Sequence, residues 1–439
     1  MILRDPVHGL IAFEGMAERV VTALLDTREV QRLRHVRQLG FTSFVFPGAE
    51  HSRFAHAIGA AHVMVRLLAR VRPMQGELAP AFRIDDEAEA DAIAAALLHD
   101  IGHGPFSHLF EDVMPSARRH EDWGIDAVRD SATEIHRALA RLDAGMPERV
   151  AALLGGTHRL AYLARAVGGT LDTDRCDYLL RDSHMTGVGY GLYDLDWLLR
   201  ALTFGELPGG RGADGVVLAI EGRKGLPPIE GFFLARQFMY EQVYHHKATR
   251  AAECLIRAIF LRVAELVRAG AEPPSVPIAM RAAALGEPVT LDEYLKLDDV
   301  VCLSAFRAWE HSADAELARL AMALGRRELP KTLPLPTDGR ASGVWERCAE
   351  RAREIAQRRG LRPERSVWLD VAWDVPYAEP DDDSPDGLWV RIRHQPLQRL
   401  GRISFLLGEL RNKRIERPRL VFPAEIRAEV QAAVEPILA

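Results

Sequence analysis

The segment ALLHDIGHGPFSH, residues 96–108, places three histidines and one aspartate within thirteen positions. His99 and Asp100 follow an apolar run that ends at Leu98. An imidazole and a carboxylate at the end of a buried helix are costly unless each has a partner. A divalent cation would satisfy both, because imidazole nitrogen and carboxylate oxygen are good metal ligands. The doublet therefore indicates a metal site that takes its other ligands from elsewhere in the chain.

His56 and Asp174 are candidates for these other ligands, because each lies in a segment that reads as a helix with apolar neighbours. A set of two histidines and two aspartates without a thiolate suits Mn, Fe, Zn, Co, Ni or Mg better than a closed structural zinc site. Such a set leaves coordination positions open, where a metal can polarise a phosphoryl oxygen and help to generate hydroxide. Spacing alone does not select these two partners, and isolated histidines such as His62 and His136 are interpreted as core or surface residues.

The elements that must position these residues are mostly helical over the first 270 residues, since apolar residues recur at steps of three and four. Ser52 is placed to cap the helix that carries His56, and Asp26 with Glu29 resembles a capping box. We expect helices over the segments 18–26, 29–40, 53–71, 86–100, 172–185 and 230–270.

Strand signals are few and lie mainly near the C-terminus. Three segments rich in β-branched and aromatic residues predict strands, at 215–221, 366–375 and 387–394. Proline-rich stretches at 271–277 and 328–340 are the expected linkers. The predicted fold class is mainly α, with a helical core over residues 1–270 and a smaller mixed α+β lobe over residues 271–439. The lobe carries no motif that indicates chemistry, so packing or oligomerisation is its expected role.

Composition limits the class of protein. The net charge of −6 over 439 residues argues against a protein that coats nucleic acid or anionic membrane through its overall charge. None of the four cysteines stands in a C-x-x-C pair, which fits free thiols in a reducing compartment. The first residues show no basic region followed by an apolar run, and no stretch approaches the roughly 18 apolar residues of a membrane span. We expect a soluble cytoplasmic protein without a membrane partner.

An ordered series of motifs resembles one family closely. The series runs DPVHG at 5–9, REVQRLRHVRQLG at 28–40, FPGAEHSRFAHAIG at 46–59, HDIGHGPFSH at 99–108, DTDRCDYLLRDS at 172–183 and VYHHK at 243–247. It is similar to the HD-domain deoxynucleoside triphosphate triphosphohydrolases, above all to the HD core of the mammalian sterile-alpha-motif/HD-domain enzyme and its bacterial relatives. The match covers roughly residues 1–265.

This resemblance implies an HD-domain helical core in which His56, His99, Asp100 and Asp174 hold one divalent metal per active site. It also implies hydrolysis of a dNTP to a deoxynucleoside and inorganic triphosphate, a reaction that controls dNTP levels. Water attacks the α-phosphorus in that reaction and the 5′-oxygen leaves. The site must therefore neutralise the α-phosphate, orient a water and supply a proton.

The resemblance also assigns catalytic positions. His108 and Glu111, three residues apart, would share a helix face, so that the carboxylate orients an imidazole that serves the leaving group or the water. His103 would contact the α-phosphate, and His120 would complete the site. Glu111 stands where the family usually has aspartate, which keeps the charge on a longer arm.

Substrate-binding positions follow in the same way. Arg53 precedes His56 by one helical turn and would grip phosphate with its forked guanidinium. Arg175 stands where the mammalian enzyme has lysine, and Arg236 matches the family's distal phosphate-binding arginine. The sugar-contacting positions match as well. Gln38 and Asp182 match the residues that contact the 3′-hydroxyl in the family. Tyr178 matches the ring that crowds the 2′ carbon, and Tyr244 would line the same pocket.

The family further implies a homotetramer, a second Mg²⁺ on the triphosphate and an activating nucleotide at a separate, allosteric site. Asp5 matches part of that site, but Phe13 stands where a basic residue is expected, so the resemblance does not extend to GTP-specific activation. Arg32, Arg34 and Arg37 would form a basic helix face that lines an effector site or is solvated.

Two other interpretations remain open. The same metal set would serve an HD-domain phosphatase or phosphodiesterase that acts on other nucleotides. Alternatively, the protein could be a nucleotide sensor or a nucleic-acid-binding scaffold, although the negative net charge argues against nonspecific affinity for nucleic acid.

Overall fold

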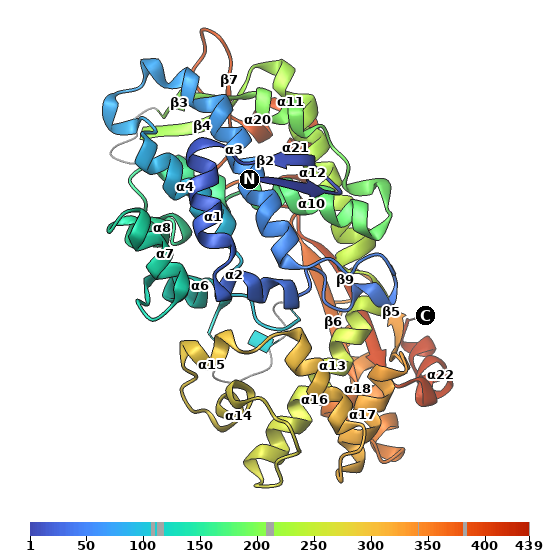
Figure 1. The fold of residues 1–439 in the computed structure, drawn as a ribbon. Helices are drawn as coiled ribbons and strands as arrows, with labels where there is room; N and C mark the ends of the chain where they lie inside the picture. Colours follow the sequence, from blue (N-terminus) through green and yellow to red (C-terminus); the bar gives the residue numbers. More distant parts are fainter. Residues whose placement is uncertain (107–109, 112–117, 208–214, 341, 381–383, 439) are drawn as a thin grey trace.

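The computed structural model describes the chain except residues 107–109, 112–117, 208–214, 341, 381–383 and 439. The described residues form a mainly helical molecule with small sheets, as the sequence predicts (Figure 1). Most of the N-terminal helices lie in the upper half of the molecule in Figure 1, and the helices between residues 278 and 366 gather in the lower half, whereas the helices of residues 400–410 lie near the upper end.

Three packed helices position the candidate ligands. α3 (Arg53–Val71) packs against both α4 (Asp86–Leu98) and α10 (Thr173–Thr186), while α1 (Gly15–Leu25) covers α4. α3 and α4 bury most of their residues because alanines and glycines allow close approach. The Asp85 side chain caps α4, and Asp172 caps α10 by accepting from the backbone N–H of Arg175. The helix predicted over 53–71 is confirmed in its bounds, whereas the helix predicted over 86–100 ends at Leu98, with His99 as its C-cap.

Shorter helices surround this core. They are α2 (Arg28–Arg32), α6 (His120–Arg129), α7 (Glu134–Leu142), α8 (Met146–Leu154), α9 (Ala161–Gly168) and α11 (Leu195–Arg200). The capping box expected at Asp26 and Glu29 is wrong. Thr27 precedes the helix instead, and the Glu29 carboxylate accepts from the backbone N–H of Glu134. The helix expected over 29–40 is short as well, because a 3₁₀ turn at Leu33–His35 ends it.

The helix expected over 230–270 is broken near its middle. α12 (Leu226–Met239) continues as a π-helical turn (Tyr240–Tyr244), and α13 (Lys247–Arg268) begins after His246, whose imidazole caps it. Apolar periodicity did not reveal the break, because the pattern continues across it.

Three sheets are formed by the described residues. The hairpin β1 (Ile2–Asp5) and β2 (Gly9–Ala12) stands alone. A second sheet has the order β3 (Leu202–Glu206), β4 (Val216–Glu221), β7 (Trp389–Arg391) and β8 (Gln398–Arg399). A third has the order β5 (Lys331–Pro334), β9 (Ile415–Phe422) and β6 (Trp368–Asp374). The three predicted strands are confirmed as β4, β6 and β7, whereas the predicted linker at 328–340 contains β5.

Most of the C-terminal half packs around α13 and the third sheet, whereas α20 (Leu400–Ile403) and α21 (Phe405–Leu410) pack against β7, β8 and α12. α13 forms a second hydrophobic core with the helices that follow it, and a third core lies between the sheet and two later helices. The elements are α14 (Ile278–Leu285), α15 (Leu291–Leu295), α16 (Asp299–Trp309), α17 (Ala315–Gly325), α18 (Val344–Arg358), α19 (Pro363–Ser366), α20 (Leu400–Ile403), α21 (Phe405–Leu410) and α22 (Arg427–Leu438).

Contacts cross the predicted boundary at residue 270. β7 pairs in parallel with β4, so that residues 389–391 complete a sheet begun by the N-terminal region. Figure 1 shows β7 and α20 beside β3 and β4, at the end of the molecule opposite α14 and α17. The division into 1–270 and 271–439 stays a prediction.

One helical stretch, residues 53–77, is long and apolar enough by composition to cross a membrane. In this structure 67% of its most apolar window is buried. That burial fits the core helix α3, which packs against α4 and α10.

A fragment of residues 1–270 tests the boundary. We expect it to lose cooperative thermal unfolding or to self-associate, because it exposes the edge of β4 and the apolar face of α13. Circular dichroism melting and size-exclusion chromatography, with the full chain as control, provide the measurement. A monomeric fragment that melts at the temperature of the full chain would establish residues 1–270 as an independent domain.

Candidate metal centre and nucleotide pocket

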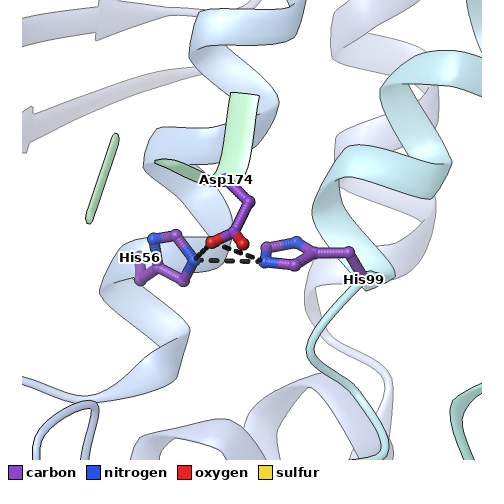
Figure 2. A group of neighbouring side chains, drawn as sticks. All are labelled: His56, His99 and Asp174. Atoms are coloured by element: carbon purple, nitrogen blue, oxygen red, sulfur yellow. Dashed lines mark hydrogen bonds and ion pairs between the residues drawn. The ribbon is translucent and has the colours of Figure 1, made fainter. Parts of the chain in front are cut away.

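Three of the four predicted ligands converge on one point between α3, α4 and α10. The Nε2 atoms of His56 and His99 are 3.1 Å apart, and Asp174 Oδ1 lies 3.0 Å from the first and 3.4 Å from the second. Figure 2 shows the two rings and the carboxylate facing one another. These are the atoms that could hold one cation.

Asp100, the fourth predicted ligand, lies at the edge of this cluster. Its Oδ2 is 3.7 Å from His56 Nε2, and its Oδ1 is 3.5 Å from His99 Nε2. Two ligand atoms that each lie about 2.1 Å from the same metal are roughly 3 to 4 Å apart, as the atoms of this cluster are. The donor set therefore fits a divalent cation held by imidazole nitrogen and carboxylate oxygen.

The electrostatics of the cluster also call for positive charge. Burial alone would lower the pKa of His56, but its hydrogen bonds with Asp174 and Asp177 raise it to about 10. Burial works in the opposite direction on Asp174, yet the two imidazoles hold the pKa of this carboxyl well below its usual range. The carboxylates thus favour positive charge at this point, and a divalent cation would supply it.

A buried network behind His56 was not predicted from the sequence. His56 Nδ1 lies 2.8 Å from Asp177 Oδ2, and Arg181 donates to both oxygens of the same carboxylate. His8 Nε2 lies 2.7 Å from Asp177 Oδ1, and Asp5 accepts from Arg181. A carboxylate that bonds the far nitrogen of a metal-binding histidine fixes the ring's orientation and tautomer.

The spacing of residues in α10 was the available signal for this network. Asp174, Asp177 and Arg181 recur at steps of three and four and share one helix face. Gly59 on α3 makes room for them, since a Cβ there would lie 1.9 Å from Asp177 Oδ1.

A cavity of about 570 Å³ opens beside the cluster. Its lining includes two predicted phosphate-binding residues, Arg53 and Arg175. Arg53 donates to Asp100 Oδ2, and Arg175 donates to Asp172 and to the carbonyl oxygen of Gly169. Both arginines thus line the pocket while carboxylates neutralise their charge.

The predicted catalytic histidines lie near the doublet as far as they are described. His103 Nδ1 is 3.2 Å from Asp100 Oδ1, and the rings of His103 and His120 are in contact, tilted by 41° with centroids 3.9 Å apart. Glu111 Oε1 lies 3.2 Å from His120 Nδ1. His108 lies outside the described residues, so the expected pairing of His108 with Glu111 stays a prediction.

The predicted sugar-binding residues line the same cavity. The Asp182 carboxylate accepts from the Tyr244 hydroxyl at 2.8 Å, and its other oxygen lies 2.7 Å from His51 Nε2. Tyr178 and Tyr244 meet edge to face. Gln38 also borders the cavity, and its buried side-chain oxygen has no partner among the described residues. His51 was not predicted, although it lies in the quoted segment FPGAEHSRFAHAIG.

Arg236 is the exception among the predicted substrate-binding residues. It lines a neighbouring cavity of about 540 Å³, which shares Arg175, Gly168 and Gly169 with the metal pocket. Its guanidinium forms a forked ion pair with Asp374 at the end of β6, with N–O distances of 2.8 and 2.9 Å.

The expected basic face is not formed by Arg32, Arg34 and Arg37. Arg32 is buried and donates to the carbonyl oxygens of His103 and Leu297. Arg34 lies over the ring of Phe54. The three arginines do not share one face, because α2 ends at Arg32 and a 3₁₀ turn follows it in place of the expected longer helix.

Comparison with known proteins agrees with this geometry. The HD domain profile matches residues 53–177. The chain is 30% identical over 430 residues to the protein YwfO of Bacillus subtilis, covering 97% of this chain and 92% of YwfO. The chain belongs to the HD-domain phosphohydrolase family.

More distant members of this family carry functional names. The human deoxynucleoside triphosphate triphosphohydrolase SAMHD1 is 25% identical over 335 residues, and the Dictyostelium discoideum homolog of SAMHD1 is 30% identical over 278 residues. The chain spans about half the length of each of these two relatives. The crystal structure of a phosphohydrolase from Bacteroides thetaiotaomicron, 27% identical, superposes with a TM-score of 0.77 over 96% of this chain and 99% of that one.

Replacing Asp177 with asparagine tests the network behind His56. Loss of a carboxylate that orients a metal-bound histidine typically lowers metal affinity 10–100-fold, so we expect a loss of about that size. Isothermal titration calorimetry of the metal-free full chain with Mn²⁺ gives the metal affinity of the wild type and of the variant.

Asp91→Asn is the matched control. Asp91 is equally buried and also binds an arginine, Arg149, but it lies on the part of α4 remote from the doublet. Equal losses of affinity in both variants would mean that Asp177 acts only through stability.

Proposed function

We propose that this HD-domain phosphohydrolase converts deoxynucleoside triphosphates to deoxynucleosides and inorganic triphosphate. One observation carries the proposal: the metal-ligand cluster, two arginines and the Asp182–Tyr244 pair all border one cavity. The names of the SAMHD1 relatives support the same substrate class.

His56, His99, Asp100 and Asp174 would hold the divalent metal, which could be Mn, Fe, Zn, Co, Ni or Mg. Such an ion supplies Lewis-acid polarisation of the α-phosphate and lowers the pKa of water. Arg53 stands beside the doublet, and its guanidinium would exchange part of its bond with Asp100 for a phosphate oxygen.

The histidines near the doublet would contact the α-phosphate and supply the proton that the leaving 5′-oxygen requires. His103 is adjacent to Asp100 and would donate to the α-phosphate. His120, whose ring is oriented by Glu111 Oε1 at 3.2 Å from its Nδ1, would complete the site. His108 would serve the leaving 5′-oxygen or the attacking water.

The sugar end of the cavity would select a deoxyribose. Asp182 would accept from the 3′-hydroxyl together with Gln38, and the Tyr178 ring would crowd the 2′ carbon. Because both oxygens of Asp182 already have donors in Tyr244 and His51, the carboxylate is held in one orientation before substrate binds.

A phosphatase or phosphodiesterase acting on other nucleotides is the second candidate. It is favoured by the position of Arg236, which borders the neighbouring cavity rather than the metal pocket. A substrate with fewer phosphates would not need to reach this residue.

Several finer properties belong to the same proposal. A homotetramer, a second Mg²⁺ on the triphosphate and an activating nucleotide follow from the resemblance to the SAMHD1 family, and a cytoplasmic location is inferred from the cysteine usage. Asp5 would contribute to the activator site only indirectly, because it binds Arg181 and the backbone N–H groups of Val7 and His8. Nucleic acid is not proposed as a main partner.

The inorganic product separates the two candidates. Incubation of the full chain with each dNTP and Mn²⁺ or Mg²⁺, with and without a second nucleotide, should release triphosphate, detected by ion chromatography. His99→Ala should abolish the release and lower the bound metal, because one imidazole of the cluster is lost. Orthophosphate as the sole inorganic product would instead establish the phosphatase.

Substitution of Asp182 tests sugar recognition. A pocket that binds a hydroxyl strongly rejects an analogue without it. We therefore expect Asp182→Asn to reduce the preference for a dNTP over its 2′,3′-dideoxy analogue by at least about 10-fold in kcat/KM. Tyr240→Phe, which alters a ring on the same cavity without touching Asp182, is the control. An unchanged preference in Asp182→Asn would remove the 3′-hydroxyl contact from the proposal.

A further inference from the structure

Arg236 is held at the end of α12 by a segment from the C-terminal half of the chain. Its Nη2 donates to Asp374 Oδ1, while its Nη1 donates to Asp374 Oδ2 and to the carbonyl oxygens of Val375 and Pro376. The guanidinium also lies 4.4 Å from the centroid of the Tyr240 ring. Three consecutive residues of the chain therefore fix the outer edge of one arginine.

This arrangement leaves one edge of the guanidinium available. The Nε–H has no partner among the described residues, and one Nη2 hydrogen remains beyond the bond to Asp374. Nε and Nη2 form the side-on edge of an arginine, which matches two oxygens of a phosphate. The carboxylate and carbonyls bind the other edge.

Arg236 is also placed along a path from the metal cluster. The metal pocket and the neighbouring cavity share Gly168, Gly169 and Arg175, and Arg236 lies beyond these residues in the second cavity. A polyphosphate whose first phosphate lies at the metal cluster would extend past Arg175 toward Arg236. Only a chain of sufficient length would reach it.

We propose that Asp374 is a positioning residue that presets Arg236 for the distal phosphate and thereby makes the site selective for triphosphates over shorter phosphate chains. This inference rests on the proposed function, because Arg236 is taken as the distal phosphate contact. It gives the C-terminal half of the chain a role in substrate recognition. A long side chain that is ordered before binding avoids the entropy cost of ordering it on binding.

The test measures binding of inorganic triphosphate and of pyrophosphate to the full chain by calorimetry, at equal metal content. We expect the wild type to bind triphosphate more tightly than pyrophosphate. Asp374→Asn should lower this ratio of affinities by about 3- to 10-fold, the cost of ordering one long side chain on binding. Pyrophosphate affinity itself should remain unchanged.

The chain offers a closely matched control on the same strand. Asp370 is also in β6 and is similarly buried, and it binds Arg250 on α13 as Asp374 binds Arg236 on α12. Asp370→Asn should have a comparable effect on the melting temperature but leave the triphosphate-to-pyrophosphate ratio unchanged. If Asp374→Asn does not fold, Asp374→Glu displaces the carboxylate by one methylene and should lower the ratio by a smaller factor.

Each outcome decides the matter. An unchanged ratio in the Asp374 variant, or an equal fall in both variants, overturns the inference. Tighter triphosphate binding by Asp374→Asn also overturns it, because Asp374 would then compete with phosphate for Arg236. The measurement requires no turnover, so a failure here is distinct from a product assay that yields orthophosphate.

Discussion

The Asp177 carboxylate is the interaction on which the rest of the site depends. It is fully buried and binds His56, His8 and Arg181 at once, so that three elements of the chain share one negative charge. Breaking a buried, hydrogen-bonded ion pair by removing one partner typically costs about 3–5 kcal/mol. The orientation of His56 is therefore fixed by the fold itself, and the absence of a side chain at Gly59 is part of the same constraint.

The cations around the pocket follow a common rule. Arg53, Arg175 and Arg236 each bind a carboxylate, and those carboxylates lie just after α4, at the start of α10 and at the end of β6. An acidic chain can in this way keep buried guanidinium groups that would otherwise be costly to desolvate. The carboxylates have already oriented these arginines when a phosphate enters the pocket. The phosphate would then share each guanidinium with a carboxylate.

Sequence predicted the parts of the site that depend on residue type and local spacing. The doublet and the helices that carry His56 and Asp174 could be found because helical periodicity and metal-ligand chemistry are local signals. Asp374 could not be found, since its partner lies 138 residues away and β6 reads only as a strand. The pairing of β4 with β7 was equally hidden, because strand partners are set by tertiary structure.

The parallel pairing of β4 with β7 has a consequence for synthesis of the chain. β7 is made about 170 residues after β4, which at about 5–20 residues per second is a delay of roughly 10 to 30 seconds. Throughout that interval the nascent chain carries an open strand edge next to its own hydrophobic body. Such an edge is a template for wrong partners, so molecular chaperones that hold growing chains would find their binding site there, on the ribosome.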